Sequence, residues 1–405
     1  MNQEVSLKRS VSLPMLTLYG LGTIIGAGIY VLIGEIAGQA GMYAPLAFLV
    51  AAIVAVFTGF TYGELAARLP YSAGEAVYVS TAFNRHWLST MIGWAVVLTG
   101  VVSAAALVNG FSGYFLVLID LPEWFVVIAL IAILGGVAAW GIEQSVWVAA
   151  IITVLSLLGL LWVLVIAGPV LENLPDRLPE MLPSASLTAW LSIMGGGFVA
   201  FYAYVGFEDM VNIAEEVKHP EQALPRAILI ALVVSSILYV LVAVVAVLAL
   251  PLEELRNSRA PLAQVMAQHS VFAERGIAVL SLLSVVNGAL VQFIMASRVI
   301  YGMATRGMAP GRFARINVTT RTPLDATVAV TVVILGLALW LPIGTLAQVT
   351  SLIILLVFAT MHLALLRLKR RDPHPEGIQI INPAVPWAGF LITLGLIVAR
   401  GLLFL

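Results

Sequence analysis

The stretch Gly20-Leu-Gly-Thr-Ile-Ile-Gly-Ala-Gly-Ile-Tyr30 places four glycines inside an apolar segment that is long enough to cross a lipid bilayer. In hydrocarbon, each unpaired backbone N–H or C=O group is strongly unfavourable. A helix that breaks in the middle of the membrane therefore has to line a cavity whose contents satisfy those groups. We expect such a break at Gly26-Ala27-Gly28. Close helix packing is the alternative interpretation, because small residues spaced four apart also let two helices approach.

The composition is that of a polytopic membrane protein. Of 405 residues, 61% are hydrophobic and 10% are charged, and the mean hydropathy is +1.05. The chain contains no cysteine, which excludes a disulfide framework, thiol catalysis and a cysteine-ligated metal. The net charge of -1 gives no reason to expect a nucleic-acid partner. We therefore expect an all-α membrane protein without a cofactor, in contact with lipid.

Apolar runs between charged or Pro/Gly-rich breaks predict eleven transmembrane spans. They lie at approximately 12–38, 43–68, 86–118, 124–141, 145–168, 188–213, 225–250, 274–306, 324–342, 345–367 and 384–404. The segments between and around them are a cytoplasmic tail at 1–11, an extracellular loop at 169–187, a cytoplasmic loop at 368–383 and the eleventh span within 384–405.

The basic residues indicate the orientation. With the N-terminus inside, fifteen of the twenty lysines and arginines fall on the cytoplasmic side, as the positive-inside rule requires. The five that fall outside this set are Arg177, Arg256, Arg259, Arg275 and Arg400. An odd number of spans then places the C-terminus on the outer side.

The order of long and short elements suggests an internal repeat. Spans three and eight are unusually long, and each follows a short stretch that could form a helix along the membrane surface, at 72–83 and at 260–272. The first stretch is expected inside and the second outside. Two five-span units of opposite orientation, 12–168 and 188–367, would produce this change of side. Such a repeat places a binding site near the middle of the membrane, where the first helix of each unit is interrupted, and so predicts a second break in span six.

Span six carries Gly195-Gly-Gly-Phe-Val-Ala-Phe-Tyr-Ala-Tyr-Val-Gly-Phe-Glu-Asp209. Crowded aromatics before Gly206 and two carboxylates at 208 and 209 favour a break at that point. As an alternative, Tyr202 and Tyr204 are ordinary packing aromatics and the glycine is a packing notch. Interrupted helices offer amide N–H groups to an anion and free carbonyls to a cation, and a zwitterion needs both.

Several motifs along the chain share one pattern. They are Gly22-Thr-Ile-Ile-Gly-Ala-Gly-Ile-Tyr30, Tyr62-Gly-Glu-Leu-Ala-Ala-Arg-Leu-Pro70, Ser72-Ala-Gly-Glu-Ala-Val-Tyr78, Phe201-Tyr-Ala-Tyr-Val-Gly-Phe-Glu-Asp209, Ala214-Glu-Glu-Val-Lys-His-Pro220, Pro225-Arg-Ala227 and Ser297-Arg-Val-Ile-Tyr-Gly-Met-Ala-Thr-Arg-Gly307. Together they resemble the amino acid-polyamine-organocation (APC) superfamily of permeases, over essentially the whole chain. The Ala-Glu-Glu-Val-Lys-x-Pro pattern is a specific match.

The resemblance implies a LeuT-type five-plus-five inverted repeat with alternating access around a central amino acid. The family often has twelve spans, whereas eleven are expected here. Backbone amides of Gly26-Ala27-Gly28 would hold the substrate carboxylate, and carbonyls of Ile24 and Val205 its ammonium group. Tyr202 falls where the family places an aromatic gate, with its hydroxyl near water. The implied site residues are Ile24, Gly26, Ala27, Gly28, Tyr202, Ala203, Val205 and Gly206.

The coupling ion is expected to be a proton, with sodium as the alternative. Sodium-coupled relatives of this fold hold the ion with hydroxyls of helix eight, where Ser281 and Ser284 lie one turn apart, although membrane serines also bond to their own backbone. Some proton-coupled members carry a lysine in helix five, but 146–167 contains no ionisable residue. Glu208 is then the candidate proton carrier. A gating role for Glu208 and Asp209 is the alternative.

Two further ionisable residues are expected near the inner membrane interface, where water is close. Glu64 lies at the end of span two, and His362 lies about one turn from the basic cluster that begins at Arg367.

These observations favour a secondary active transporter of amino acids in a plasma membrane, and the compact loops suggest a prokaryotic one. An enzyme is not expected, because the five histidines are scattered without ligand spacing. A nutrient sensor or a channel of the same fold is an alternative that would bind an amino acid without concentrating it. The small, uncharged residues 101–106 of span three favour neutral or varied side chains. Glu208 leaves a cationic amino acid, or exchange for a polyamine, as the alternative cargo.

Overall fold

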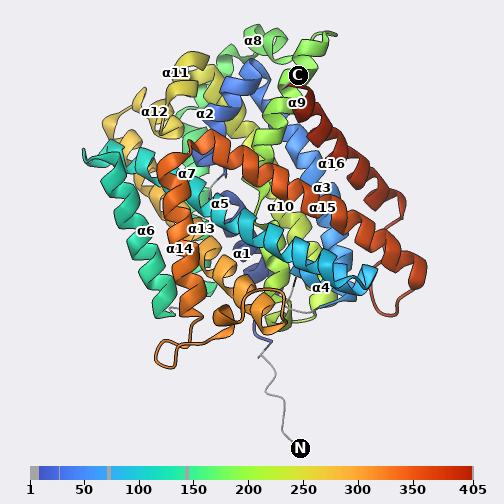
Figure 1. Cartoon of the computed structure of the whole chain (residues 1–405). Helices are drawn as coiled ribbons and strands as arrows, with labels where there is room; N and C mark the ends of the chain where they lie inside the picture. The colour runs from blue at the N-terminus through green and yellow to red at the C-terminus, as the bar shows by residue number, and fades with distance from the viewer. Residues whose placement is uncertain (1–8, 27, 71–73, 142–145, 404–405) are drawn as a thin grey trace, which may run out of the picture.

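The computed structural model describes residues 9–26, 28–70, 74–141 and 146–403, which fold as helices joined by short loops (Figure 1). No β-strand occurs in these ranges. The predicted all-α membrane architecture is confirmed. Nine stretches of the described helix are long and apolar enough to cross a membrane, and one of them, Leu13–Arg68, covers the first two predicted spans. The count of eleven crossings stays a prediction.

The helix boundaries follow the hydropathy pattern closely, because apolar runs between breaks leave the backbone no other way to satisfy itself in lipid. The long helices are α1 Leu13–Ile25, α2 Gly28–Ala40, α3 Ala44–Arg68, α5 His86–Leu118, α6 Glu123–Trp140, α7 Val146–Ile166, α9 Leu187–Ala200, α10 Pro220–Ala249, α13 Val271–Thr305, α14 Leu324–Trp340, α15 Ile343–Arg371 and α16 Ala384–Leu402. The shorter ones are α4 Gly74–Phe83, α8 Leu174–Met181, α11 Leu252–Asn257 and α12 Pro261–Ala267. The 3-10 helices are η1 Gly41–Tyr43, η2 Gly168–Asn173, η3 Phe201–Tyr204, η4 Phe207–Glu216 and η5 Gly311–Ala314.

The first predicted span is divided into two helices. Helix α1 ends at Ile25, and α2 begins at Gly28. Gly26 lies between them with helical torsion angles and still donates its N–H to the carbonyl of Gly22. Ala27 lies outside the described residues. The end of α1 and the start of α2 flank the predicted position, and the break itself stays a prediction.

The sixth predicted span is divided more sharply. Helix α9 passes into the tighter helix η3, which ends at Tyr204. Val205 is extended, and Gly206 has φ +120°, a value that glycine adopts far more readily than any residue with a side chain. The chain then continues as η4. Gly206 thus forms the predicted second break.

The helices pack in two large groups. Helix α5 packs most extensively against α13, and α3 against α10, while α1 lies on α10 and α7. The short helix α4 lies at the lower end of the bundle in Figure 1, and α8, α11 and α12 lie at the upper end. The two predicted surface stretches are therefore at opposite ends. The second of them is shorter than expected, because α12 stops at Ala267 and α13 already begins at Val271.

Candidate functional site

The two helix breaks lie directly against each other. A side chain added at Gly28 would overlap Ala203, and a Cβ added at Gly206 would lie 2.7 Å from the carbonyl oxygen of Thr23. Close packing, the alternative interpretation of these glycines, is therefore part of the structure. The same contact also brings the backbone of both segments to one place, so the two interpretations do not exclude each other.

A tyrosine hydroxyl joins the two breaks. Tyr239 on α10 places its Oη 2.8 Å from the carbonyl oxygen of Ile24 and 3.1 Å from that of Ala203. A hydroxyl has a single proton, so both carbonyls share it. Two carbonyl oxygens from separate helices thus converge on one point, as ammonium binding requires. The second carbonyl comes from Ala203, two residues before Val205, which the sequence had suggested. Tyr239 itself is buried in an apolar helix and was not predicted.

A carboxylate accepts a hydrogen bond from a backbone amide at the second break. The Gly206 N–H donates to Oε2 of Glu208 at 2.8 Å, just where η4 begins. The amide of Gly26, an expected substrate ligand, donates to Gly22 at 3.1 Å. Glu208 therefore shows that a backbone N–H group at a break can bind a carboxylate. Within the described residues, its hydrogen bond is to backbone, and no arginine or hydroxyl partner occurs among them.

Tyr202 packs against α5. Its Oη lies 3.1 Å from both the hydroxyl and the carbonyl oxygen of Ser103. Only 3% of the tyrosine is exposed. The expectation that its hydroxyl stays near water is therefore wrong in this conformation, because Ser103 supplies the polar partner inside the bundle.

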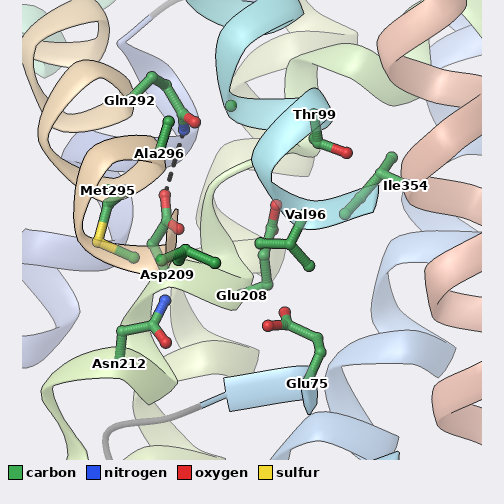
Figure 2. Close-up of a pocket in the computed structure, with 12 residues that line it drawn as sticks. Glu75, Val96, Thr99, Glu208, Asp209, Asn212, Gln292, Met295, Ala296 and Ile354 are labelled. Atoms are coloured by element: carbon green, nitrogen blue, oxygen red, sulfur yellow. Dashed lines mark hydrogen bonds between the residues drawn. The ribbon is translucent and has the colours of Figure 1, made fainter. Parts of the chain in front are cut away.

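A pocket adjoins the second break on the side of α4 (Figure 2). Helices α4, α5, η4, α13 and α15 contribute its lining residues, which are Glu75, Val96, Thr99, Gly100, Glu208, Asp209, Asn212, Gln292, Met295, Ala296, Val299 and Ile354. Asp209 accepts a hydrogen bond from Gln292 Nε2 at 3.2 Å, drawn as the dashed line in Figure 2. The pocket therefore gathers three carboxylates at one end of the site.

Glu75 is the carboxylate that the sequence did not point to. It accepts a hydrogen bond from the hydroxyl of Tyr62 at 2.9 Å and is 3% exposed. Burial raises the pKa of its carboxyl, against the lowering effect of its hydrogen bonds with its own backbone and with Tyr62. In the described part of the chain, no lysine or arginine forms an ion pair with any of the three pocket carboxylates.

The two candidate sodium ligands, Ser281 and Ser284, differ in the hydrogen bonding of their hydroxyl groups. Ser281 donates to the carbonyl of Ile277 at 2.8 Å, which is the backbone bond weighed as its alternative. The hydroxyl of Ser284 is buried and has no hydrogen-bond partner among the residues described. Its carbonyl oxygen lies 3.2 Å from where a Cβ of Gly26 would be, so α13 runs past the first break.

Glu64 and His362 are more deeply buried than their expected interfacial positions allow. Glu64 is 2% exposed and lies 2.8 Å from Arg68 and 2.7 Å from Lys369. His362 is completely buried, with Nδ1 2.8 Å from the hydroxyl of Thr61. The expectation of ready solvation is wrong, because α16 and the loop before it cover this side of α3 and α15.

Two apolar spans, interrupted where they meet, define a multi-pass membrane protein with a buried polar site. No group of three or more histidine or acidic side chains within the described ranges could hold a metal ion. A family model described as amino acid permease matches residues 11–405. The chain therefore belongs to the amino acid permease family.

Curated relatives are similar over almost the whole chain. Cationic amino acid transporter 2, vacuolar, of Arabidopsis thaliana is 30% identical over 92% of this chain and 61% of its own length. The branched-chain amino acid permease BcaP of Bacillus subtilis is 28% identical over 98% of this chain and 89% of its own length. The methylthioribose transporter of Bacillus subtilis is 27% identical over 93% of this chain and 84% of its own length. The chain thus spans less than two thirds of the plant relative.

Proposed function

We propose that this protein is a secondary active transporter that moves amino acids across the plasma membrane by alternating access. The observation that carries the proposal is the convergence of the Ile24 and Ala203 carbonyls on one buried point. A protein without a polar ligand has no use for two helix breaks that present main-chain acceptors at the same place. The family assignment and the printed names of the relatives support amino acid transport.

In this proposal, the ammonium group of the substrate replaces the hydroxyl proton of Tyr239 at the two carbonyls. The carboxylate binds to amides around Gly28 at the start of α2, where the positive end of the helix favours an anion. Tyr202 closes the outer side of the site by its contact with Ser103. The substrate is then released through the pocket beside Glu75.

The proposed architecture is the five-plus-five inverted repeat, with residues 12–168 and 188–367 as its units. The paired interruptions in the first helix of each unit support it. So do the two surface helices α4 and α12, which lie at opposite ends of the bundle. Alternating access follows if the group around α1, α3 and α10 tilts against the group around α5 and α13.

A neutral side chain is the proposed cargo, because the wall of α5 opposite the breaks is small and uncharged. Val101, Val102 and Ser103 are buried there. A cationic side chain is the second candidate. It is supported by the pocket carboxylates, which have no arginine or lysine partner in the described residues, and by the name of the plant relative.

The proposed coupling ion is a proton carried by Glu208. This side chain touches the second break and lines the pocket, so its protonation could depend on whether the pocket is open. Sodium is the alternative, and the unpartnered hydroxyl of Ser284 beside the first break is the observation in its favour.

Uptake by the purified protein in liposomes tests the proposal. Labelled leucine and labelled arginine are offered separately, without sodium, under an imposed pH gradient that is acidic outside. We expect leucine to accumulate above the outside concentration. Binding without accumulation in any gradient would instead indicate a sensor, and equilibration without accumulation would indicate a channel.

A further inference from the structure

A buried group of charges ties α3 to α15 at the cytoplasmic end. The Glu64 carboxylate lies 2.8 Å from the guanidinium of Arg68 on its own helix and 2.7 Å from Nζ of Lys369 on α15. Both side chains of the Glu64–Lys369 pair are at most 6% exposed. Opening a buried ion pair is strongly unfavourable, because each ion would be left without its partner. We call this group the Glu64 clamp.

The clamp also holds the loop between α15 and α16. The backbone N–H of Ile381 donates to Oε2 of Glu64 at 2.9 Å, and Lys369 donates to the carbonyl of Ile381 at 2.6 Å. Arg68 donates to the carbonyl of Asp372 at 2.9 Å. Both ends of the loop are thus fixed to the same charges, so α16 starts from a point that α3 and α15 define together.

A second polar contact lies two helical turns deeper on the same face of α15. His362 Nδ1 is 2.8 Å from the hydroxyl of Thr61, and Nε2 is 3.4 Å from that of Thr58, both on α3. Helix α16 covers the ring, since a Cβ on Gly389 would lie 2.7 Å from Nε2. Three helices therefore meet at the histidine without room for a side chain between them.

Helix α15 nevertheless has its largest contact with the other helix group. It packs most extensively against α5, and Ile354 lines the pocket opposite residues of α5. Below Ile354, Phe358 packs against the rings of Tyr62, Phe201 and Phe207, which belong to α3 and the broken span six. The cytoplasmic half of α15 is thus bound to the moving side of the proposed transporter. Helix α15 also packs against α4, where the guanidinium of Arg367 lies 5.5 Å from the ring centre of Phe83 and Arg371 donates an exposed hydrogen bond to the carbonyl of Thr81.

We propose that α3, the cytoplasmic half of α15 and α16 move as one unit during transport, held by the Glu64 clamp and His362. The inference rests on the proposed function, because it says which helices change places when the site opens. The clamp stays closed throughout the cycle, and α15 bends near Ile354, between its two packing partners. The eleventh helix is then a moving part of the transporter.

Cross-linking tests this proposal in a chain that has no cysteine of its own. In the variant Glu64→Cys/Lys369→Cys, the clamp is absent until a short bifunctional thiol reagent bridges the two positions. We expect the unbridged variant to transport several-fold more slowly than the parent and the bridged variant to recover most of the parent rate. Loss of transport on bridging would overturn the proposal, because it would mean that the clamp has to open.

A matched cysteine pair that joins the two helix groups serves as the control in which bridging is expected to block the motion. Val31 on α2 packs onto Gly110 on α5, where a Cβ would touch it. The variant Val31→Cys/Gly110→Cys exchanges bulk between the two positions. Its disulfide is expected to stop transport, and reduction to restore it. If both bridged variants transport like the parent, the helices do not move as proposed.

Distances between spin labels give a readout that does not depend on transport. Labels at the lipid-exposed residues Ile53 on α3 and Leu391 on α16 both lie in the proposed unit, whereas a label at Trp87 lies on α5. The Ile53–Leu391 distance is expected to be single and unchanged with or without a mixture of amino acids. Two populations for this pair would overturn the unit. Absence of uptake by the cysteine-free parent would instead overturn the proposed function.

Discussion

The hydroxyl of Tyr239 lies 2.8 Å from the carbonyl oxygen of Ile24, so a side chain of α10 donates a hydrogen bond to the last turn of α1. The same hydroxyl reaches Ala203 in the second broken span. This contact gives both buried carbonyl oxygens a hydrogen-bond donor. In the proposed function, the ammonium group of the substrate takes the place of this donor.

Replacing Tyr239 by phenylalanine is expected to destabilise the protein without substrate and to increase the stabilisation that substrate binding provides. Loss of a donor to buried carbonyls costs about 1–3 kcal/mol. An ammonium group that fills the gap restores those bonds, so the rise in melting temperature on adding substrate should be larger than in the parent. Differential scanning fluorimetry measures both quantities.

Tyr204→Phe is the matched control for this change. Its ring packs against Tyr239, but its hydroxyl donates to the carbonyl of Phe48 on α3 at 3.3 Å. We expect a lower melting temperature but an unchanged shift on adding substrate. Equal substrate shifts in Tyr239→Phe and the parent would show that the ammonium group binds elsewhere.

Gly28→Val is expected to abolish binding. The new side chain would overlap Ala203 and force the two breaks apart, and overpacking of this kind costs about 1–3 kcal/mol or more. A scintillation proximity assay with labelled substrate measures the loss. Gly336→Val on α14 is the control, because a Cβ there meets nothing within 4 Å. If Gly28→Val bound substrate with the affinity of the parent, the substrate would not bind at the breaks.

Glu208→Gln is expected to separate coupling from binding. The amide oxygen can still accept from the Gly206 N–H, but the side chain can no longer carry a proton. Uptake driven by a pH gradient should be lost, while exchange of labelled for unlabelled substrate at constant pH should persist. Ser284→Ala should leave uptake unchanged. If uptake by the parent strictly required sodium, and Ser284→Ala lost this sodium-driven uptake, the sodium alternative would be established instead.

Glu75→Gln is expected to stabilise the protein increasingly as the pH rises. Burial raises the pKa of Glu75 above its ordinary value of 4.5, so the folded protein holds its proton more tightly than the unfolded chain. The stability that this group contributes is present below the ordinary pKa and is lost as the pH rises through the raised one. The melting temperature of Glu75→Gln relative to the parent should therefore increase between pH 4 and pH 8, roughly the range that this linkage covers.

The exposed Glu180 provides a control of opposite sign. Its hydrogen bond with Arg177 lowers the pKa of the Glu180 carboxyl, so the stability that it adds is lost as the pH falls. Glu180→Gln should be slightly less stable than the parent at neutral pH, with the difference vanishing in acid. If Glu75→Gln showed this pattern instead, the Glu75 carboxylate would be stabilised in its charged form.

Hydropathy predicted the helices well because the bilayer leaves few alternatives. The third span was expected at 86–118, and α5 covers those residues. The breaks were also predictable, since Gly206 stands where a positive φ is needed and carboxylates follow at once. These are local signals, which can be read from neighbouring residues in the chain.

The parts that could not be predicted depend on distant contacts. Tyr239 looks like any aromatic of an apolar span until α10 is packed between the breaks. Glu75 was placed on a surface helix, but α4 turns it into the bundle under Tyr62. Glu64 and His362 were expected near water because nothing in their own helices indicates that α16 covers them.

The central claim is that the two breaks together bind the ammonium and carboxylate groups of one zwitterion. Binding of substrates in which one of these groups is chemically modified tests it most directly. A thermal-shift screen of the twenty amino acids, agmatine and putrescine first identifies the ligand that stabilises the protein most. Its affinity is then compared with that of its N-acetyl derivative and of its methyl ester. We predict that either modification abolishes binding, because each removes the partner of one break. Undiminished affinity for either derivative would contradict the account.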